Sequence, residues 1–138
     1  MKVALDTNVL VSAVATRGLC ADLFHATLAE QQLVVGETVL AELRRALRQK
    51  LRVPADTLDA LDAFLRRQAI VVSSAPALGL KIRDPADGPV LAEAVAGSAD
   101  VFVTGDHDLL DVGTKSPIPI LTPRAYWERL RANPGSAE

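Results

Sequence analysis

The sequence predicts an α/β protein with a mainly parallel central sheet and helices on both of its faces. Short apolar runs rich in Val and Leu recur along the chain, and most are followed by a segment whose apolar residues have helical spacing. This alternation is typical of βαβ units, in which the connecting helices cover a parallel sheet. Hydrophobic residues make up 49% of the 138 residues, which is enough for a sizeable core in one domain.

Five segments are predicted to be strands because they are short and apolar, and are mostly bounded by polar or turn residues. The second segment closes at Gly36. The last contains Pro119, which cannot donate to a strand ladder and therefore places that strand at an edge of the sheet. The predicted strands are Val3–Leu5, Leu33–Val35, Ile70–Val72, Val101–Val103 and Ile118–Leu121.

The helices are predicted from apolar residues that recur every three to four positions, most clearly over Glu37–Arg48. We expect Asp56 to cap the helix that follows Pro54. Residues 73–85 are rich in Pro, Gly and Ser and are predicted to be a loop. The helical segments are Val9–Ala15, Ala21–Ala29, Glu37–Arg48, Asp56–Gln68, Pro89–Ala96, the short turn Asp106–Asp111, and Pro123–Arg131. Residues 1–132 are thus predicted to be a single domain, and residues 133–138 a disordered tail.

Charge and cysteine content limit the classes of function. A net charge of −2 excludes a strongly basic footprint over the whole chain, although not a local one. The single cysteine, Cys20, cannot form an internal disulfide and indicates a reducing compartment. No span is apolar enough to cross a bilayer, and Asp6 interrupts the N-terminal apolar run before a signal peptide could form. We therefore expect a cytoplasmic protein that does not use a membrane.

Four acidic residues are predicted to lie where parallel α/β sheets bind ligands, outside the carboxyl ends of the strands. Asp6 directly follows the first strand, and Asp106 follows the fourth. Asp87 lies at the N-terminal edge of the helix before the fourth strand, and Glu42 lies beside the buried stripe of its own helix. Carboxylates in one pocket raise one another's pKa, and a divalent cation with a preference for oxygen ligands removes that conflict. The four acids therefore predict a metal site.

Each acid also has a purely structural interpretation. Asp6, Asp87 and Asp106 each lie at the start of a helical segment, where an aspartate often caps the first turn. Glu42, taken alone, is typical of a solvated helix residue. The metal hypothesis rests on the recurrence of acids at strand ends, with hydrogen bonds from the Thr7–Asn8 segment or nearby backbone offsetting the charge of Asp6.

Four stretches in a fixed order carry a resemblance to a known family. They are VALDTNVLVSA, ETVLAELRRAL, DPADGPVLAEAV and VFVTGDHDLL. Together they resemble the PIN domain, as in the VapC-like toxins of bacterial toxin–antitoxin pairs, over nearly the whole chain from Lys2 to Leu130. The resemblance implies a three-layer α/β/α nuclease that uses Mg²⁺ or Mn²⁺ to hydrolyse RNA, together with an antitoxin partner and a homodimer.

The resemblance also assigns site residues position by position. The catalytic and metal-binding acids are Asp6, Glu42, Asp87 and Asp106, joined by Asp108 as a further metal ligand, with Asn8 and Thr104 in support. Asp84 competes with Asp87 for the third place, and we prefer Asp87 because it adjoins an apolar helix whereas Asp84 is locked before Pro85. Gly88–Pro89 departs from the longer polar or charged residues that often follow this acid, which changes a substrate or partner contact without removing a ligand.

The densest basic run, RRALRQKLR, is the candidate RNA-binding segment. Its residues Arg44, Arg45, Arg48 and Lys50 begin just after Glu42, so they are placed to follow phosphates toward the metal site. An ordinary solvated helix face is the competing interpretation.

Three other functions compete with a toxin nuclease. One is an RNA- or partner-binding module of the same fold without turnover, and another is an RNA-processing nuclease outside a toxin–antitoxin pair. A phosphotransfer protein is disfavoured, because LDTN lacks the second acid two residues on and VTGDHD lacks a lysine.

Overall fold

A single five-stranded sheet forms the centre of the molecule. The computed structural model describes residues 1–132, and the tail predicted at residues 133–138 lies outside them. The strands are β1 (Lys2–Leu5), β2 (Gln32–Gly36), β3 (Ile70–Val72), β4 (Val101–Val103) and β5 (Ile120–Leu121). They lie in the order β3-β2-β1-β4-β5, and every neighbouring pair is parallel. The predicted sheet is confirmed, and it is parallel throughout.

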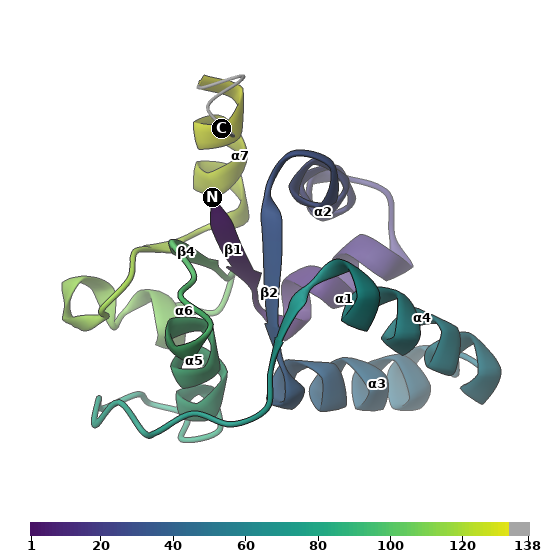
Figure 1. Ribbon diagram of the computed structural model, residues 1–138, viewed down its shortest axis with the longest axis horizontal. Helices are drawn as coiled ribbons and strands as arrows, with labels where there is room; N and C mark the ends of the chain where they lie inside the picture. The colour runs from purple at the N-terminus through teal and green to yellow at the C-terminus, as the bar shows by residue number, and fades with distance from the viewer. Residues whose placement is uncertain (133–138) are drawn as a thin grey trace.

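Helices cover the sheet on both faces and complete the predicted three-layer α/β/α architecture. In the described part of the chain they are α1 (Thr7–Ala15), α2 (Leu19–Glu30), α3 (Glu37–Leu51), α4 (Ala55–Gln68), α5 (Asp87–Ala96), α6 (His107–Leu110) and α7 (Pro123–Ala132), with a 3₁₀ turn at Gly113–Lys115. Figure 1 shows α5 and α6 on one side of the sheet and α1 to α4 on the other. The closing helix α7 packs against α2 and β5.

The strand order places a change of direction between β1 and β4. The chain runs from β1 outward to β2 and β3, and then crosses to β4 and continues outward to β5 on the other side. The two carboxyl ends are tied directly, because the backbone N–H of Asp6 donates to the carbonyl of Val103 at 2.9 Å. In open parallel sheets this switch point is where ligands bind.

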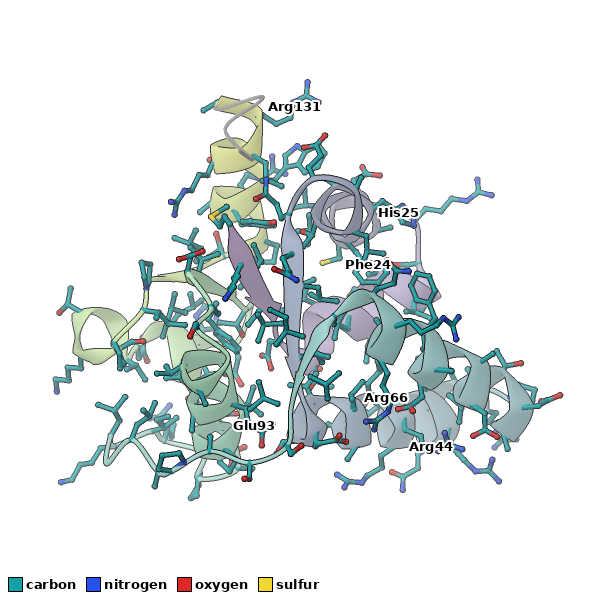
Figure 2. All side chains as sticks on the ribbon, in the orientation of Figure 1. Phe24, His25, Arg44, Arg66, Glu93 and Arg131 are labelled. Carbon is teal, nitrogen blue, oxygen red and sulfur yellow. The ribbon has the colours of Figure 1, made fainter. Side chains whose placement is uncertain are left out.

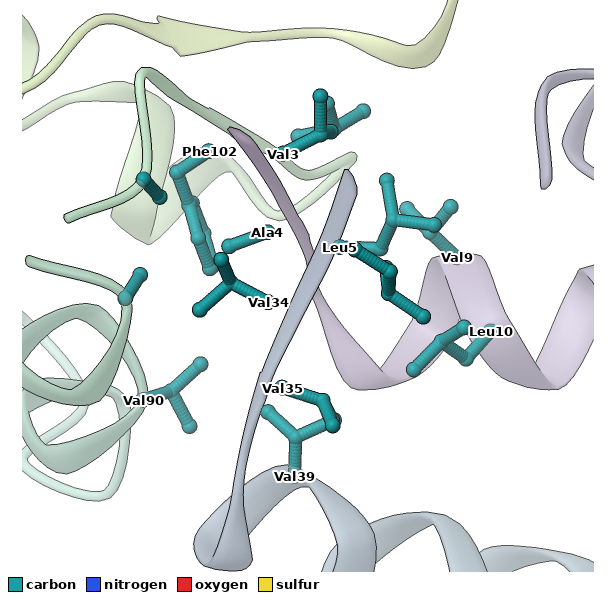
Figure 3. Close-up of a cluster of buried hydrophobic side chains, with 14 of the residues drawn as sticks. Val3, Ala4, Leu5, Val9, Leu10, Val34, Val35, Val39, Val90 and Phe102 are labelled. Carbon is teal, nitrogen blue, oxygen red and sulfur yellow. The ribbon is translucent and has the colours of Figure 1, made fainter. Parts of the chain in front are cut away.

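The core lies on both faces of the sheet, so the central strands are apolar at nearly every position. Ala4 is in register with Val34 on one side and with Phe102 on the other. Figure 3 shows these side chains on the face where Val90 of α5 lies, whereas Leu5 points to the opposite face. Because β1 and β4 are parallel, with Leu5 in register with Val103, the residues that follow the two strands lie at the same edge of the sheet.

Two local expectations need correction. Asp56 does not cap α4: the N-cap is Pro54, and Asp56 lies in the first turn of the helix. The last strand is Ile120–Leu121 rather than Ile118–Leu121. Its register with β4 begins at Ile120, and Pro119, which has no N–H, contributes only its carbonyl, which accepts the N–H of Phe102 at 2.9 Å. The position of this strand at the edge of the sheet agrees with the prediction.

Within residues 1–132, no single helix is long and apolar enough to cross a membrane. The pair α1 and α2 passes that test only when taken together, and it is bent by 102°.

Candidate metal and catalytic site

An open depression of about 260 Å³ lies at the carboxyl edge of the sheet and is lined by all four predicted acids. We call it the acidic depression. Its acids come from four different parts of the fold: the ends of β1 and β4, and the helices α3 and α5. They are Asp6, Glu42, Asp87 and Asp106.

Asp6 is the most buried of these acids, with 5% of its surface exposed. Its Oδ1 accepts a hydrogen bond from the N–H of Thr7 at 2.8 Å, which caps α1. Its Oδ2 accepts from the hydroxyl of Thr104 at 2.7 Å. Burial raises the pKa of Asp6, and the hydrogen bonds from Thr104 and Thr7 oppose that rise only in part. The capping role and the place in the depression therefore belong to the same side chain.

Thr104 joins the ends of the two central strands. It is fully buried, and its hydroxyl oxygen accepts from the N–H of Asp106 at 3.0 Å while donating to Asp6. Asp106 in turn caps α6, because its Oδ1 accepts from the N–H of Asp108 at 2.9 Å. This chain of hydrogen bonds fixes Asp6 and Asp106 relative to one another.

Glu42 is held by a residue that sequence reasoning connected only with Asp6. The hydroxyl of Thr7 donates to Glu42 Oε1 at 2.5 Å, so Thr7 bridges the start of α1 and the middle of α3. This bond results from the packing of α1 against α3, so the local sequence around either residue does not predict it. Asn8, predicted as a supporting residue, is exposed and lies at the rim of the depression.

Asp87 contrasts with its neighbours because one of its oxygens is unpaired. Its Oδ2 is buried and has no hydrogen-bond partner within residues 1–132. Burial, followed by the nearby carboxylates of Asp106, Asp84 and Asp6, raises the pKa of Asp87 to about 7. The structure therefore leaves a repulsion among acids that its own donors do not relieve.

The chemistry of this donor set fits a hard divalent cation. One carboxylate oxygen each from Asp87, Asp106 and Asp108 lie within 4.8 Å of one another. The ligands are all oxygen, as Mg²⁺ and Mn²⁺ prefer. A cation at this position would also give the unpaired Asp87 oxygen a partner.

The competing acid Asp84 lies near Asp87 but outside the lining of the depression. It is exposed, and its Oδ1 accepts from the N–H of Ala86 at 3.0 Å, which holds the turn before α5. It is not among the residues that line the acidic depression. Asp87 is the first residue of α5, and the N-cap position belongs to Ala86, so Asp87 does not act as the cap.

The predicted RNA-binding residues fall on two faces of α3. Arg45 and Lys50 follow Glu42 at three and eight positions, which is one helical face, and both line the acidic depression together with Gln49. Arg44 lies on the α4 side, where it pairs with Asp59 at 2.7 Å (Figure 2).

Arg48 and Arg83 do not line the acidic depression. Arg48 is exposed. Arg83, in the loop before α5, approaches Asp108 at 3.8 Å with 85% of its side chain exposed.

Comparison with known proteins identifies the class. A family model described as the PIN domain matches residues 2–108, a range that includes every acid of the depression. The chain therefore belongs to the PIN domain family, as its motifs predicted. No curated protein sequence matches it.

Solved structures similar to this chain share its fold at low sequence identity. The VapBC2 complex of Rickettsia felis, bound to a DNA fragment from its promoter, has a TM-score of 0.60 at 20% identity, covering 88% of this chain and 97% of that chain. FitAcB from Neisseria gonorrhoeae has a TM-score of 0.56 at 17% identity, with 88% and 98% covered. FitAB bound to the IR36 DNA fragment has a TM-score of 0.56 at 16% identity, with 88% and 94% covered.

Proposed function

We propose that the protein is a metal-dependent endoribonuclease that hydrolyses RNA phosphodiester bonds, and that it is the toxin of a type II toxin–antitoxin pair. The observation that carries the nuclease proposal is the convergence of Asp6, Glu42, Asp87 and Asp106 in one open depression. Membership of a family whose members are generally ribonucleases supports it. The likeness of the fold to the VapBC2 and FitAB structures supports an antitoxin partner.

Mg²⁺ or Mn²⁺ is the cofactor that the acids of the depression are suited to hold. Asp87, Asp106 and Asp108 would provide oxygen ligands, with Asp6 and Glu42 beside them. When bound, such a cation polarises the phosphodiester and neutralises negative charge on the departing oxygen.

The protein's own side chains orient the site. Thr104 and the Thr7 backbone hold both oxygens of Asp6, and the Thr7 hydroxyl holds Glu42, so these carboxylates keep one direction before substrate arrives. Without a cation the pKa of Asp87 is raised to about 7, and a bound cation would favour the charged form of this carboxylate as a ligand. Arg45 and Lys50 supply positive charge at the rim for phosphates of a bound strand.

The test of the nuclease proposal is cleavage of single-stranded RNA by the purified protein with and without Mg²⁺ or Mn²⁺. We expect EDTA to abolish cleavage, and D6N to lower the rate more than about a hundredfold. The matched control is D100N, because Asp100 is an exposed acid whose carboxylate accepts the Lys2 N–H at 2.7 Å at the opposite end of the sheet. Cleavage that persists in EDTA or in D6N would refute the proposal, and RNA binding without cleavage under any divalent cation would indicate a binding module.

The toxin part of the proposal needs a separate experiment. Expression of the unsubstituted chain in bacteria should arrest growth, whereas D6N should not. Unimpeded growth with soluble, RNA-cleaving protein in the cells would favour an RNA-processing role instead.

A further inference from the structure

Helix α5 carries a buried acid that lies outside the acidic depression. Glu93 is 6% exposed and stands between the buried Ala92 and Ala94. Figure 2 shows it on the side of α5 toward β2 and the start of α3. A buried carboxylate is costly unless donors hold it, so its partners indicate what it does.

Both partners of Glu93 belong to a single residue in the first turn of α3. Its Oε1 accepts the backbone N–H of Thr38 at 3.0 Å, and its Oε2 accepts the Thr38 hydroxyl at 2.5 Å. The first N–H groups of a helix lack partners within the helix, and an acceptor with negative charge is favourable there. The N-cap residue of α3 is Gly36, which has no side chain to offer. Glu93 therefore caps α3 from a different helix.

Gly36 makes room for this contact. A Cβ atom built on Gly36 would lie 1.9 Å from Glu93 Oε1 and 2.6 Å from Glu93 Cβ. The backbone at Gly36 has φ −90°, which any residue adopts, so the close approach of Glu93 and not the backbone conformation requires glycine. Residues 36, 38 and 93 thus form one fitted contact between α3 and α5.

The contact lies close to both helical acids of the depression. Glu42 follows Thr38 by four positions, which places the two on the same face of α3 about one turn apart. Asp87 precedes Glu93 by six positions on α5, which is less than about two turns. Because Asp87 Oδ2 has no hydrogen-bond partner in the described chain, its place depends on how α5 is anchored.

We propose that Glu93 is a positioning residue: by holding the first turn of α3 from α5, it sets Glu42 and Asp87 at the separation that the metal site requires. This inference rests on the proposed function. It adds a residue that does not line the acidic depression and acts through the two helices.

The experiment measures Mn²⁺ affinity by calorimetry, alongside thermal unfolding in EDTA, for variants of the full chain. T38V keeps the volume of the side chain and removes the hydroxyl, and E93A removes the whole contact. We expect both to weaken Mn²⁺ binding about tenfold while the protein remains folded. E93Q retains an acceptor for the N–H and a polar partner for the hydroxyl, so it should restore most of the affinity.

The matched control is T27V. Thr27 is also a buried helical threonine whose hydroxyl bridges to a second helix, because it bonds the hydroxyl of Tyr126 at 2.7 Å. Neither α2 nor α7 carries an acid of the depression. T27V should therefore lower the unfolding temperature and leave Mn²⁺ affinity unchanged.

The possible results separate this inference from the proposed function. Equal Mn²⁺ affinity in T38V, E93A and the unsubstituted chain would show that the contact only stabilises the fold, and would overturn the inference. If E93Q binds Mn²⁺ as weakly as E93A does, the negative charge of Glu93 and not its hydrogen bonds would account for the loss of affinity. That result would also overturn the inference. Absence of Mn²⁺ binding by the unsubstituted chain would overturn the metal-dependent function and this inference together.

Discussion

The two halves of the acidic depression are built differently. On the side of β1 and β4, Thr104 ties Asp6 to the segment that holds Asp106, and each of these acids also caps a helix. On the side of α5, Asp87 has a buried oxygen without a hydrogen-bond partner within residues 1–132, and burial together with neighbouring acids raises its pKa. The first half, which we call the tied half, is therefore oriented by hydrogen bonds within the protein. The second, which we call the unpaired half, keeps a buried carboxylate oxygen that no donor in the described residues contacts.

Among variants that keep all four acids, T104V should have the largest effect, because it breaks the tied half of the depression. This change keeps the volume of a fully buried side chain and removes the hydroxyl that serves both Asp6 Oδ2 and the Asp106 N–H. RNA cleavage should fall about 10–100-fold, because the carboxylates lose their fixed directions. The free energy of unfolding should fall by about 1–3 kcal/mol, since a buried acceptor is left unpaired.

T104S is the control for this prediction, because it retains the hydroxyl. Initial rates of cleavage and urea unfolding curves give the two quantities. A T104V protein that keeps the full rate of cleavage would show that the hydroxyl is not what orients Asp6.

The second prediction tests the unpaired half through pH. The pKa of Asp87 is raised from 3.8 to about 7 in the folded protein, so the folded state binds its proton more tightly than the unfolded state does. In EDTA, the contribution of Asp87 to stability should therefore fall as the pH rises from about 4 to about 7 and then level off. D87N removes this loss, so it should become more stable than the unsubstituted protein as the pH rises through that range.

Added Mn²⁺ should reverse the order of stability of these two proteins at mildly alkaline pH. The carboxylate of Asp87 can bind the cation as a charged ligand, whereas the amide in D87N cannot. Thermal unfolding across the pH range, with EDTA and with Mn²⁺, measures both effects. A stability difference between D87N and the parent that does not vary with pH would contradict the raised pKa of Asp87.

The smallest expected effect is on RNA binding by the basic residues at the rim of the acidic depression. The double variant R45A/K50A should weaken RNA binding in EDTA and reduce the slope of log affinity against log salt by about 1 for each lost phosphate contact. R44A/R48A is matched in number of charges but lies off the lining of the depression, with Arg44 paired to Asp59. Fluorescence anisotropy with a labelled single strand at several salt concentrations distinguishes the two. A larger change of slope in R44A/R48A would place the RNA path over the α4 side of α3.

The tied half is the part of the site most open to prediction from sequence. Asp6 follows an apolar strand and Asp106 follows another, and parallel strands bring such ends together, so two acids could be placed from local patterns alone. Pro119 likewise placed β5 at the edge of the sheet, because the lack of an N–H is a property of the residue itself.

The contacts made by residues on helices are harder to predict from the sequence. Helical periodicity counted from Glu42 favours Arg45 over Arg44 as a lining residue, so the sequence itself contains that distinction. The bond from Thr7 to Glu42 depends on how α1 packs on α3, and the bond from Thr38 to Glu93 depends on how α5 packs on α3. The only local signal for Glu93 is a single acid within the apolar run VLAEAVA. Contacts of this kind are fixed by tertiary packing and cannot be read from one segment.

The fitted contact at Gly36 also has a consequence for protein engineering. Replacing a glycine that has an ordinary backbone conformation by alanine commonly raises thermostability, because it restricts the unfolded chain. Position 36 would pass that criterion on its φ of −90°, yet the added methyl group would collide with the Glu93 carboxylate. The two positions therefore constrain one another, and a larger residue at 36 becomes tolerable only in a background where residue 93 has first been shortened.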